Sequence, residues 1–228
     1  MKQLILDIGL GVESTLNSFA PGENEAVLAH LRLWVGSPTR SPVPTYLWGG
    51  SGSGKTHLLK AVRHALTDRG VRVGWLDATA SDAGEFDDSW GAVLMDDVDR
   101  LDSTGQQVAF NWFVNALSPS SGEARWVLAC GAMPPADLAL RDDLRSRLGW
   151  GHVFQLHPPS ESERRAVLRK AADARGIFLA DEVIDYILGR FPRDLGSLMA
   201  LLDRLDRFAL QNKRNVTLPL LRAMLESE

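Results

Sequence analysis

The stretch GGSGSGKT at residues 49–56 fits the pattern G-x-x-x-x-G-K-[ST]. The apolar run PTYLW at 44–48 precedes it and the helix-like segment THLLKAVRHAL at 56–66 follows, so a strand leads in and a helix leads out. Glycines let backbone N–H groups turn inward around an anion, and the helix N-terminus adds the positive end of its dipole. A Gly/Ser loop without function explains neither the Lys-Thr pair nor the flanking elements. The stretch therefore predicts a phosphate-binding loop.

The side chains at the end of this loop predict a nucleotide with a divalent cation. We expect Lys55 to reach the β- and γ-phosphates and Thr56 to ligate Mg²⁺. The bound nucleotide is expected to be ATP or ADP. The loop residues expected to bind it are Gly49, Gly50, Ser51, Gly52, Ser53, Gly54, Lys55, Thr56 and His57.

A second motif, AVLMDDVDRL at residues 92–101, is an apolar strand that runs into two carboxylates. A carboxylate at the carboxyl end of a strand beside a phosphate loop can hold Mg²⁺ directly or through water. We assign Asp96 to the metal site. Asp97 stands where many ATPases place a Glu that orients the attacking water, so we predict a catalytic role for it; a helix cap or a surface charge is the alternative.

Five short apolar runs lie within the first 157 residues, most of them separated by segments of helix length. Such runs, apolar on both faces and alternating with helices, are typical of a parallel sheet covered by helices. The sequence therefore predicts an α/β P-loop NTPase with a five-stranded parallel sheet. The predicted strands are at 44–48, 71–76, 92–97, 125–131 and 152–156.

No strand is predicted after the fifth one. Pro158 and Pro159 end that strand, and Ser160 can cap a helix together with Glu163 three residues later. Helices are predicted at about 160–175, 181–191, 194–211 and 217–227, and the third carries an apolar stripe at three- and four-residue steps that indicates a helical core. The stripe consists of Leu195, Leu198, Met199, Leu202, Leu205 and Ala209. We predict a tail at 1–12, a nucleotide-binding domain at 13–157 and a C-terminal helical lid at 158–228.

The composition narrows the class of protein. The 228 residues carry a net charge of −4, which gives no overall electrostatic attraction to nucleic acid. The apolar runs fall short of the roughly 18 residues that a membrane-spanning helix needs, so we expect a cytoplasmic protein and no membrane partner. Cys130 is the single cysteine, which excludes an intrachain disulfide, and we expect it to be buried.

Two further stretches of the sequence contain three arginines of interest. LRSRLGWG at 144–151 places Arg145 and Arg147 just before the fifth strand, and FPRDLGSL at 191–198 places Arg193 at the start of a lid helix. Together with the two motifs above, these strings resemble the AAA+ ATPases of the DnaA family of bacterial replication initiators. The resemblance implies that Arg147 is an arginine finger, which completes the ATP site of a neighbouring subunit, and that Arg193 senses the protein's own nucleotide. A solvated surface charge is the alternative for Arg145 and Arg147.

The family resemblance extends over residues 16–228. It implies that the segment LNSFAPGENEAVLAHL at 16–31 packs against the adenine, with Phe19 and Gly22 as contacts; Phe19 as a core anchor is the alternative. Ala132 stands in our register where the initiator has a polar sensor residue, which predicts weak intrinsic hydrolysis. The initiator continues into a carboxyl-terminal DNA-binding domain, whereas this sequence ends after the lid, so we expect no sequence-specific DNA binding.

The hexapeptide QLILDI at residues 3–8 lies well ahead of the first predicted strand. It resembles peptides that dock into the hydrophobic pocket of the bacterial DNA sliding clamp, the β subunit of DNA polymerase III. The resemblance implies that Gln3 bonds at the rim while Leu4, Leu6 and Ile8 fill the groove. An extended hexapeptide spans roughly 20 Å, which suits a linear groove-binding motif. A terminal edge strand is the alternative.

The clamp peptide and the missing DNA-binding domain together resemble the Hda branch of the DnaA family, the regulatory inactivators of DnaA. We therefore expect a regulator, associated with the nucleoid or the replisome, that binds the clamp and promotes hydrolysis of ATP on the DnaA initiator, with a possible homodimer as an inactive form. The alternative is an autonomous DnaA-like ATPase that loads a helicase or remodels DNA. An unrelated kinase or GTPase is disfavoured, because no Asn-Lys-x-Asp string for reading guanine is present.

Overall fold

The computed structural model describes residues 14–37, 42–78, 84–119, 122, 124–192 and 194–227. Five parallel strands form one sheet in the order β2-β3-β4-β1-β5, which confirms the predicted α/β fold. The strands lie within the five predicted runs: β1 is Thr45–Trp48, β2 Val73–Leu76, β3 Ala92–Met95, β4 Trp126–Gly131 and β5 His152–Gln155.

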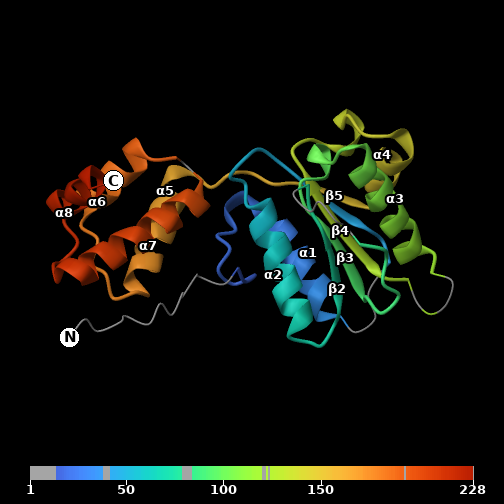
Figure 1. Cartoon of the computed structure of the whole chain (residues 1–228), viewed down its shortest axis with the longest axis horizontal. Coiled ribbons are helices and arrows are strands. Elements are labelled where there is room, and N and C mark those ends of the chain that lie inside the picture. Colours follow the sequence, from blue (N-terminus) through green and yellow to red (C-terminus); the bar gives the residue numbers. More distant parts are fainter. Residues whose placement is uncertain are drawn as a thin grey trace.

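Helices cover both faces of the sheet, so this part of the molecule has three layers (Figure 1). On one face α1 (Glu25–Gly36) and α2 (Lys55–Thr67) pack on the strands through a shared apolar core. On the other face α3 (Ser103–Leu117) and α4 (Asp142–Leu148) form a second core. Short turns of 3₁₀ helix complete the region: η1 at Gly22–Asn24, η2 at Val98–Arg100 and η3 at Pro135–Asp137.

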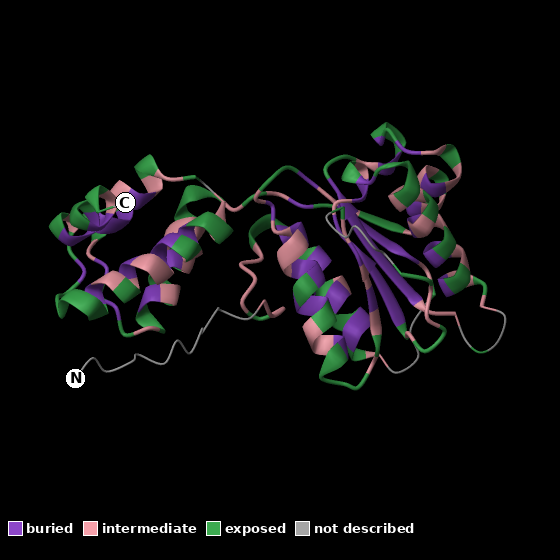
Figure 2. Ribbon diagram, viewed as in Figure 1, coloured by how far each residue is buried: buried purple, intermediate pink, exposed green. Residues whose placement is uncertain are grey.

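Burial follows the position of each strand in the sheet (Figure 2). All four residues of β3 and all six of β4 are buried, because helices cover both faces of these inner strands. β5 lies at the edge of the sheet, and three of its four residues are exposed. The continuous apolar runs of the sequence therefore mark the inner strands most clearly.

The described part of the chain after residue 160 folds into helices with a separate core: α5 at Glu161–Asp173, α6 at Asp181–Arg190, α7 at Leu195–Asn212 and α8 at Leu218–Glu226. The predicted capping box is present, since the Ser160 side chain accepts from the Glu163 backbone N–H and the Glu163 carboxylate accepts from the Ser160 N–H. The predicted stripe of α7 faces this core: four of its six residues are buried and Leu195 and Met199 pack against them. These helices form the C-terminal lid.

A reciprocal pair of hydrogen bonds ties the N-terminal segment to the connection between sheet and lid. The buried side chain of Asn24 donates from Nδ2 to the His157 carbonyl (2.9 Å) and accepts from the His157 N–H at Oδ1 (2.8 Å). At Gly22 the backbone has a φ of +48°, and a Cβ there would clash with Oε1 of Glu163 in the lid. The positive φ favours glycine at this point, where the N-terminal segment and α5 approach each other closely.

No helix within the described ranges combines the length and the apolarity needed to cross a membrane.

Candidate functional site

The strand order brings the two predicted motifs to one edge of the sheet. The phosphate loop follows β1 and Asp96 follows β3, while β4 lies between these strands and pairs with both. Parallel strands end at a common edge, and ligands of open α/β sheets bind in the crevice outside that edge. The loop is also fastened to β4, because the Gly49 N–H donates to the Gly131 carbonyl at 3.3 Å.

Lys55 is the first residue of α2 and its side chain turns back into the loop. Its Nζ donates to the carbonyls of Gly49 (2.7 Å) and Gly50 (3.1 Å), and the residue is buried. The buried ammonium therefore lies at the centre of a loop whose following helix directs its N-terminus to the same point. This geometry fits an anionic phosphate group.

Two loop glycines have backbone conformations that other residues rarely adopt. Gly52 has a φ of +77° and Gly54 a φ of +95°. A Cβ at Gly54 would lie 2.6 Å from the ring of Phe19, and one at Gly52 would lie 3.1 Å from Cβ of Asp194 at the start of α7. Ser53 adds an observation of its own: its buried Oγ has no hydrogen-bond partner within the described part of the chain. The loop thus offers a polar cradle of the kind that bound phosphate completes.

Asp96 is buried at the end of β3 and one of its carboxylate oxygens is saturated. Its Oδ1 accepts from the Cys130 thiol (Sγ to Oδ1, 2.8 Å) and from the Asp97 N–H (3.0 Å). Cys130 is fully buried, as the sequence predicted. Among the described residues no hydrogen bond to Oδ2 is present, which leaves that oxygen for a cation. Oxygen donors from Asp96 and Thr56 are the kind that Mg²⁺ prefers, so this donor set fits the ion.

Asp97 has a backbone that only a few residue types tolerate and a carboxyl that is harder to ionise than usual. Its φ of 45° and ψ of 48° place it in the left-handed region. Burial, followed by the neighbouring Asp96 carboxylate, raises the pKa of Asp97 above its ordinary value, against the opposing effect of Lys55. Burial likewise raises the pKa of the Cys130 thiol, so this group remains the protonated donor to Asp96. Asp96, Asp97 and Cys130 place one ligand atom each within 4.8 Å of one another.

Ala132 follows directly on β4, close to this centre. Its backbone N–H donates to Oδ1 of Asp99 at 2.9 Å, and its methyl side chain is exposed. A methyl group can neither hydrogen-bond a γ-phosphate nor orient a water molecule.

The N-terminal segment covers the start of α2 through Phe19 and His57. The ring of Phe19 lies 5.9 Å from the imidazole of His57, measured between centroids. His57 Nε2 lies 3.3 Å from both the Ser18 hydroxyl and the Thr15 carbonyl. Burial lowers the pKa of His57, which favours the neutral ring. Phe19 also packs partly against the core beneath α1, which agrees with its reading as a core anchor; the adenine contact stays a prediction.

Two neighbouring arginines of α4 differ in their partners. Arg145 donates from Nη2 to Oδ1 of Asp142 at 2.6 Å, which gives it a carboxylate partner within the same helix. The guanidinium of Arg147 instead lies over the ring of Phe110 on α3, 5.1 Å from the centroid, and has no carboxylate partner among the residues that the structure describes. Arg147 is therefore the arginine of this helix whose charge is available for another anion.

Several predicted site residues lie outside the described residues. These are Gln3, Leu4, Leu6 and Ile8 of the hexapeptide, and Arg193. Asp194, the next residue along the chain, lies beside Gly52 of the phosphate loop.

Sequence reasoning missed the contributions of Cys130 and Phe110 to these sites. Cys130 was predicted only as a buried apolar residue, and it gives a hydrogen bond to Asp96 from a neighbouring strand. Phe110 lies 37 positions before Arg147 on another helix, so no spacing rule relates the two residues.

Comparisons with known proteins fit these observations. Residues 10–83 match the family model of the bacterial DnaA ATPase domain, and residues 161–225 match the model of the Hda lid domain. Domain III of the Thermotoga maritima replication initiation protein DnaA has a similar fold, with a TM-score of 0.76 and 24% identity over 95% of this chain and 97% of that chain. AMPPCP-bound DnaA from Aquifex aeolicus gives 0.64 and 23% over 89% and 74% of the two chains. The Thermotoga maritima RuvB Holliday junction branch migration motor gives 0.62 and 15% over 89% and 68%.

Proposed function

We propose that this chain, in which residues 10–83 match the bacterial DnaA ATPase domain and residues 161–225 match the Hda lid domain, regulates the initiation of chromosomal replication. In this proposal it binds the DNA sliding clamp through residues 3–8 and faces the DnaA initiator with α4. Arg147 then enters the ATP site of DnaA and accelerates hydrolysis, which prevents re-initiation of replication.

The contrast between Arg145 and Arg147 carries this proposal. An arginine finger must offer an uncompensated guanidinium to the phosphates of another subunit. No carboxylate among the described residues pairs with Arg147, and its guanidinium lies over the ring of Phe110. Arg145, in contrast, is paired with Asp142. An arginine in this position stabilises the charge that develops on the transferred phosphoryl group.

The protein's own nucleotide has a structural role in this proposal. ATP or ADP with Mg²⁺ would be held by the phosphate loop, with Lys55 at the phosphates and with Thr56 and Asp96 at the ion. Phe19 and Gly22 would lie at the base, and Arg193 would contact the phosphates from the lid. The exposed methyl of Ala132 and the shortness of Asp97 favour slow turnover. A ligand that binds only the folded protein with its lid in one position stabilises that position.

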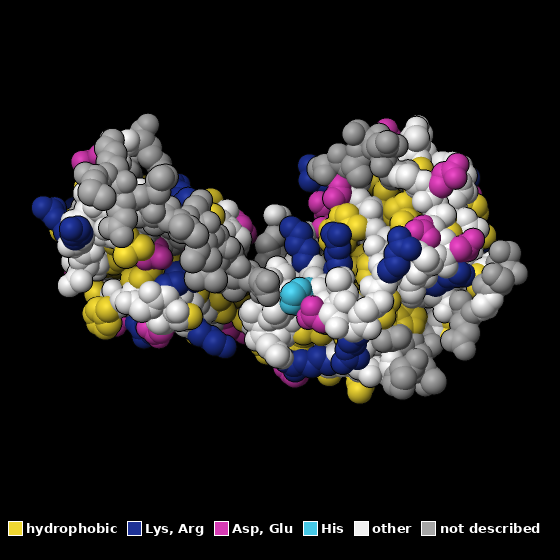
Figure 3. Space-filling view, turned by 60° about the horizontal axis from the view of Figure 1, so that its bottom comes forward, with side chains coloured by type: hydrophobic (Ala, Val, Ile, Leu, Met, Phe, Trp, Pro, Cys, Tyr) yellow, Lys and Arg dark blue, Asp and Glu magenta, His cyan; other side chains and the backbone are white. Residues whose placement is uncertain are grey.

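The distribution of charge on the surface favours binding to protein partners over sequence-specific binding to DNA. On the face shown in Figure 3, Lys and Arg side chains are interspersed with Asp and Glu side chains. The net charge of −4 agrees with this mixture. Clamp binding would then supply the contact with replicating DNA that the chain's own charge does not favour.

The clamp contact is tested by replacing Gln3. We expect Gln3→Ala to weaken binding to the clamp about tenfold, because the lost hydrogen bond at the rim is worth about 1.4 kcal/mol. The matched control is Asp7→Ala, which changes a residue of the same peptide outside the groove-filling set. Binding is measured by fluorescence anisotropy with the clamp on nicked circular DNA. Equal affinities of wild type, Gln3→Ala and Asp7→Ala would exclude this peptide as the clamp ligand.

A further inference from the structure

The helix that carries Arg147 is too short to be stable without contacts to the rest of the protein. α4 has seven residues, and isolated helices of this length are unstable in water. On its inner side Leu144 and Leu148 are buried in the core beneath α3. These two anchors fix the helix on the sheet, but they leave the direction of its half-buried arginines, Arg145 and Arg147, to other contacts.

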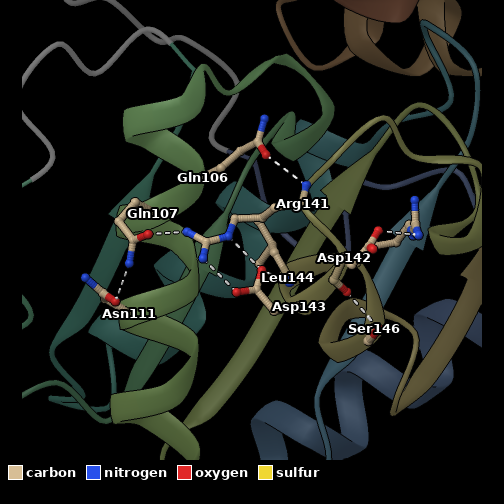
Figure 4. A network of polar contacts seen from close by, with 9 residues as sticks. Gln106, Gln107, Asn111, Arg141, Asp142, Asp143, Leu144 and Ser146 are labelled. Carbon is tan, nitrogen blue, oxygen red and sulfur yellow. Dashed lines mark hydrogen bonds and ion pairs between the residues drawn. The ribbon is translucent and has the colours of Figure 1, made fainter.

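Arg141, directly before α4, supplies such contacts to both helices (Figure 4). Its Nε donates to Oδ1 of Asp143 and its Nη2 donates to Oδ2, each at 2.7 Å. Its Nη1 donates to Oε1 of Gln107 on α3, and its backbone N–H donates to Oε1 of Gln106 at 3.0 Å. A bidentate pair of this kind fixes the plane of the guanidinium more firmly than a single surface ion pair does.

The carboxylate that Arg141 holds also anchors the first turn of α4. Oδ1 of Asp143 accepts from the Leu144 N–H at 2.7 Å. Desolvation acts to raise the pKa of Asp143, but the hydrogen bonds from Arg141 and from the backbone outweigh it, so the pKa lies below its ordinary value. The carboxylate is thus ionised at neutral pH and binds the helix start and Arg141 together.

Arg141 and Arg147 share one aromatic ring. Each guanidinium carbon lies 5.1 Å from the centroid of Phe110. Two uncompensated cations on one ring would repel each other. Because Asp143 neutralises Arg141, Arg147 can use the ring without that repulsion.

We propose that Arg141 is a positioning residue, which locks Phe110 and the start of α4 so that Arg147 projects in one defined direction. This inference rests on the proposed function for its effect on a partner, but the geometry that it describes belongs to this chain alone. The misplacement of a reacting group by about 1 Å can lower a rate about 100-fold. Arg141 therefore affects the chemistry without touching the phosphates.

The first test follows Arg147 within the isolated protein. The Nε–H resonance of Arg147, observed in a ¹⁵N–¹H correlation spectrum and assigned with Arg147→Lys, is expected to carry a ring-current shift that Phe110→Leu removes. Arg141→Gln and Arg141→Lys should both remove most of this shift, because neither replacement reproduces the planar fork. Arg145→Gln should retain it. An unchanged Arg147 resonance in both Arg141 variants would overturn the proposal, whatever the partner does.

The second test measures hydrolysis of ATP on DnaA with clamp and DNA present. Arg141→Gln should lower the rate at saturation about 10- to 100-fold and leave the half-saturating concentration within about twofold of wild type, which separates positioning from partner contact. Asp143→Asn should give the same pattern. The double variant Arg141→Gln/Arg147→Ala should be no slower than Arg147→Ala.

The two tests distinguish a failure of the positioning role of Arg141 from a failure of the proposed function. Arg141 variants at the wild-type rate, beside an inactive Arg147→Ala, would refute the positioning role and retain the proposed function. No stimulation by the wild type, beside the expected shift in the spectrum, would refute the function and retain the positioning role. Thermal melts of each variant show whether the fold is intact. If Arg141→Gln does not fold, both tests are made with Asp143→Asn instead.

Discussion

Replacing Arg147 with alanine is expected to lower the hydrolysis of DnaA-bound ATP about 10³- to 10⁵-fold relative to the stimulated rate, the range known for arginine fingers supplied in trans. The guanidinium lies on Phe110 without a carboxylate partner among the described residues, so its removal costs the isolated protein little. Its effect appears only when the phosphates of a partner approach. Single-turnover hydrolysis of labelled ATP on DnaA, with clamp and DNA, measures the change.

Two controls make the Arg147 result specific. Arg145→Ala removes an arginine of the same helix that is already paired with Asp142, and its rate should stay close to wild type. Arg147→Ala should bind its own ADP with unchanged affinity. The guanidinium of Arg147 lies over Phe110 of α3, whereas the phosphate loop lies between β1 and α2. A stimulated rate that survives in Arg147→Ala, or that disappears equally in Arg145→Ala, would contradict the assignment of the finger.

Replacing Lys55 with alanine should weaken binding of ADP or ATP to this chain about 100-fold, because a charge-assisted contact to phosphate is worth up to about 3 kcal/mol. Nζ of Lys55 already lies at the centre of the loop, 2.7 Å from the Gly49 carbonyl. Isothermal titration with ADP and Mg²⁺ measures the affinity. Lys60→Ala serves as the matched control, since Lys60 is an exposed residue of the same helix.

The same variant tests whether the nucleotide stabilises the fold. Wild-type protein with ADP at about 100 times the dissociation constant should gain about 2.7 kcal/mol in its free energy of unfolding, and Lys55→Ala at that ADP concentration should gain much less. Thermal melts with and without ADP give this comparison. Equal stabilisation of both proteins by ADP would place the nucleotide elsewhere on the chain.

The sheet and the lid were predictable from sequence because their signals are local. Each inner strand is a short apolar run with helices on both sides, and the phosphate loop marks which strand is β1. The capping box at Ser160 and the stripe of α7 are likewise patterns within a few turns of chain. Burial of both faces of the strands leaves few alternative arrangements.

The contacts that tune the site were not predictable in the same way. Cys130 meets Asp96 because β4 lies beside β3, and Asn24 meets His157 across 133 positions of sequence. Arg141 and Arg147 meet at Phe110 only after α3 and α4 have packed on one face of the sheet. Such pairings depend on tertiary packing, and neither periodicity nor spacing reports them. The readings of residues 3–8 and of Arg193 stay predictions, since these residues lie outside the described ranges.

The most direct test of the regulatory account is the decay of labelled ATP bound to DnaA after this protein is added, with DNA-loaded clamp, with free clamp and without clamp. We predict rapid hydrolysis only when the protein and the DNA-loaded clamp are both present, and its loss with Gln3→Ala. Hydrolysis that does not depend on the clamp, together with efficient ATP turnover by this chain alone, would contradict the account and favour an autonomous DnaA-like ATPase that loads a helicase or remodels DNA.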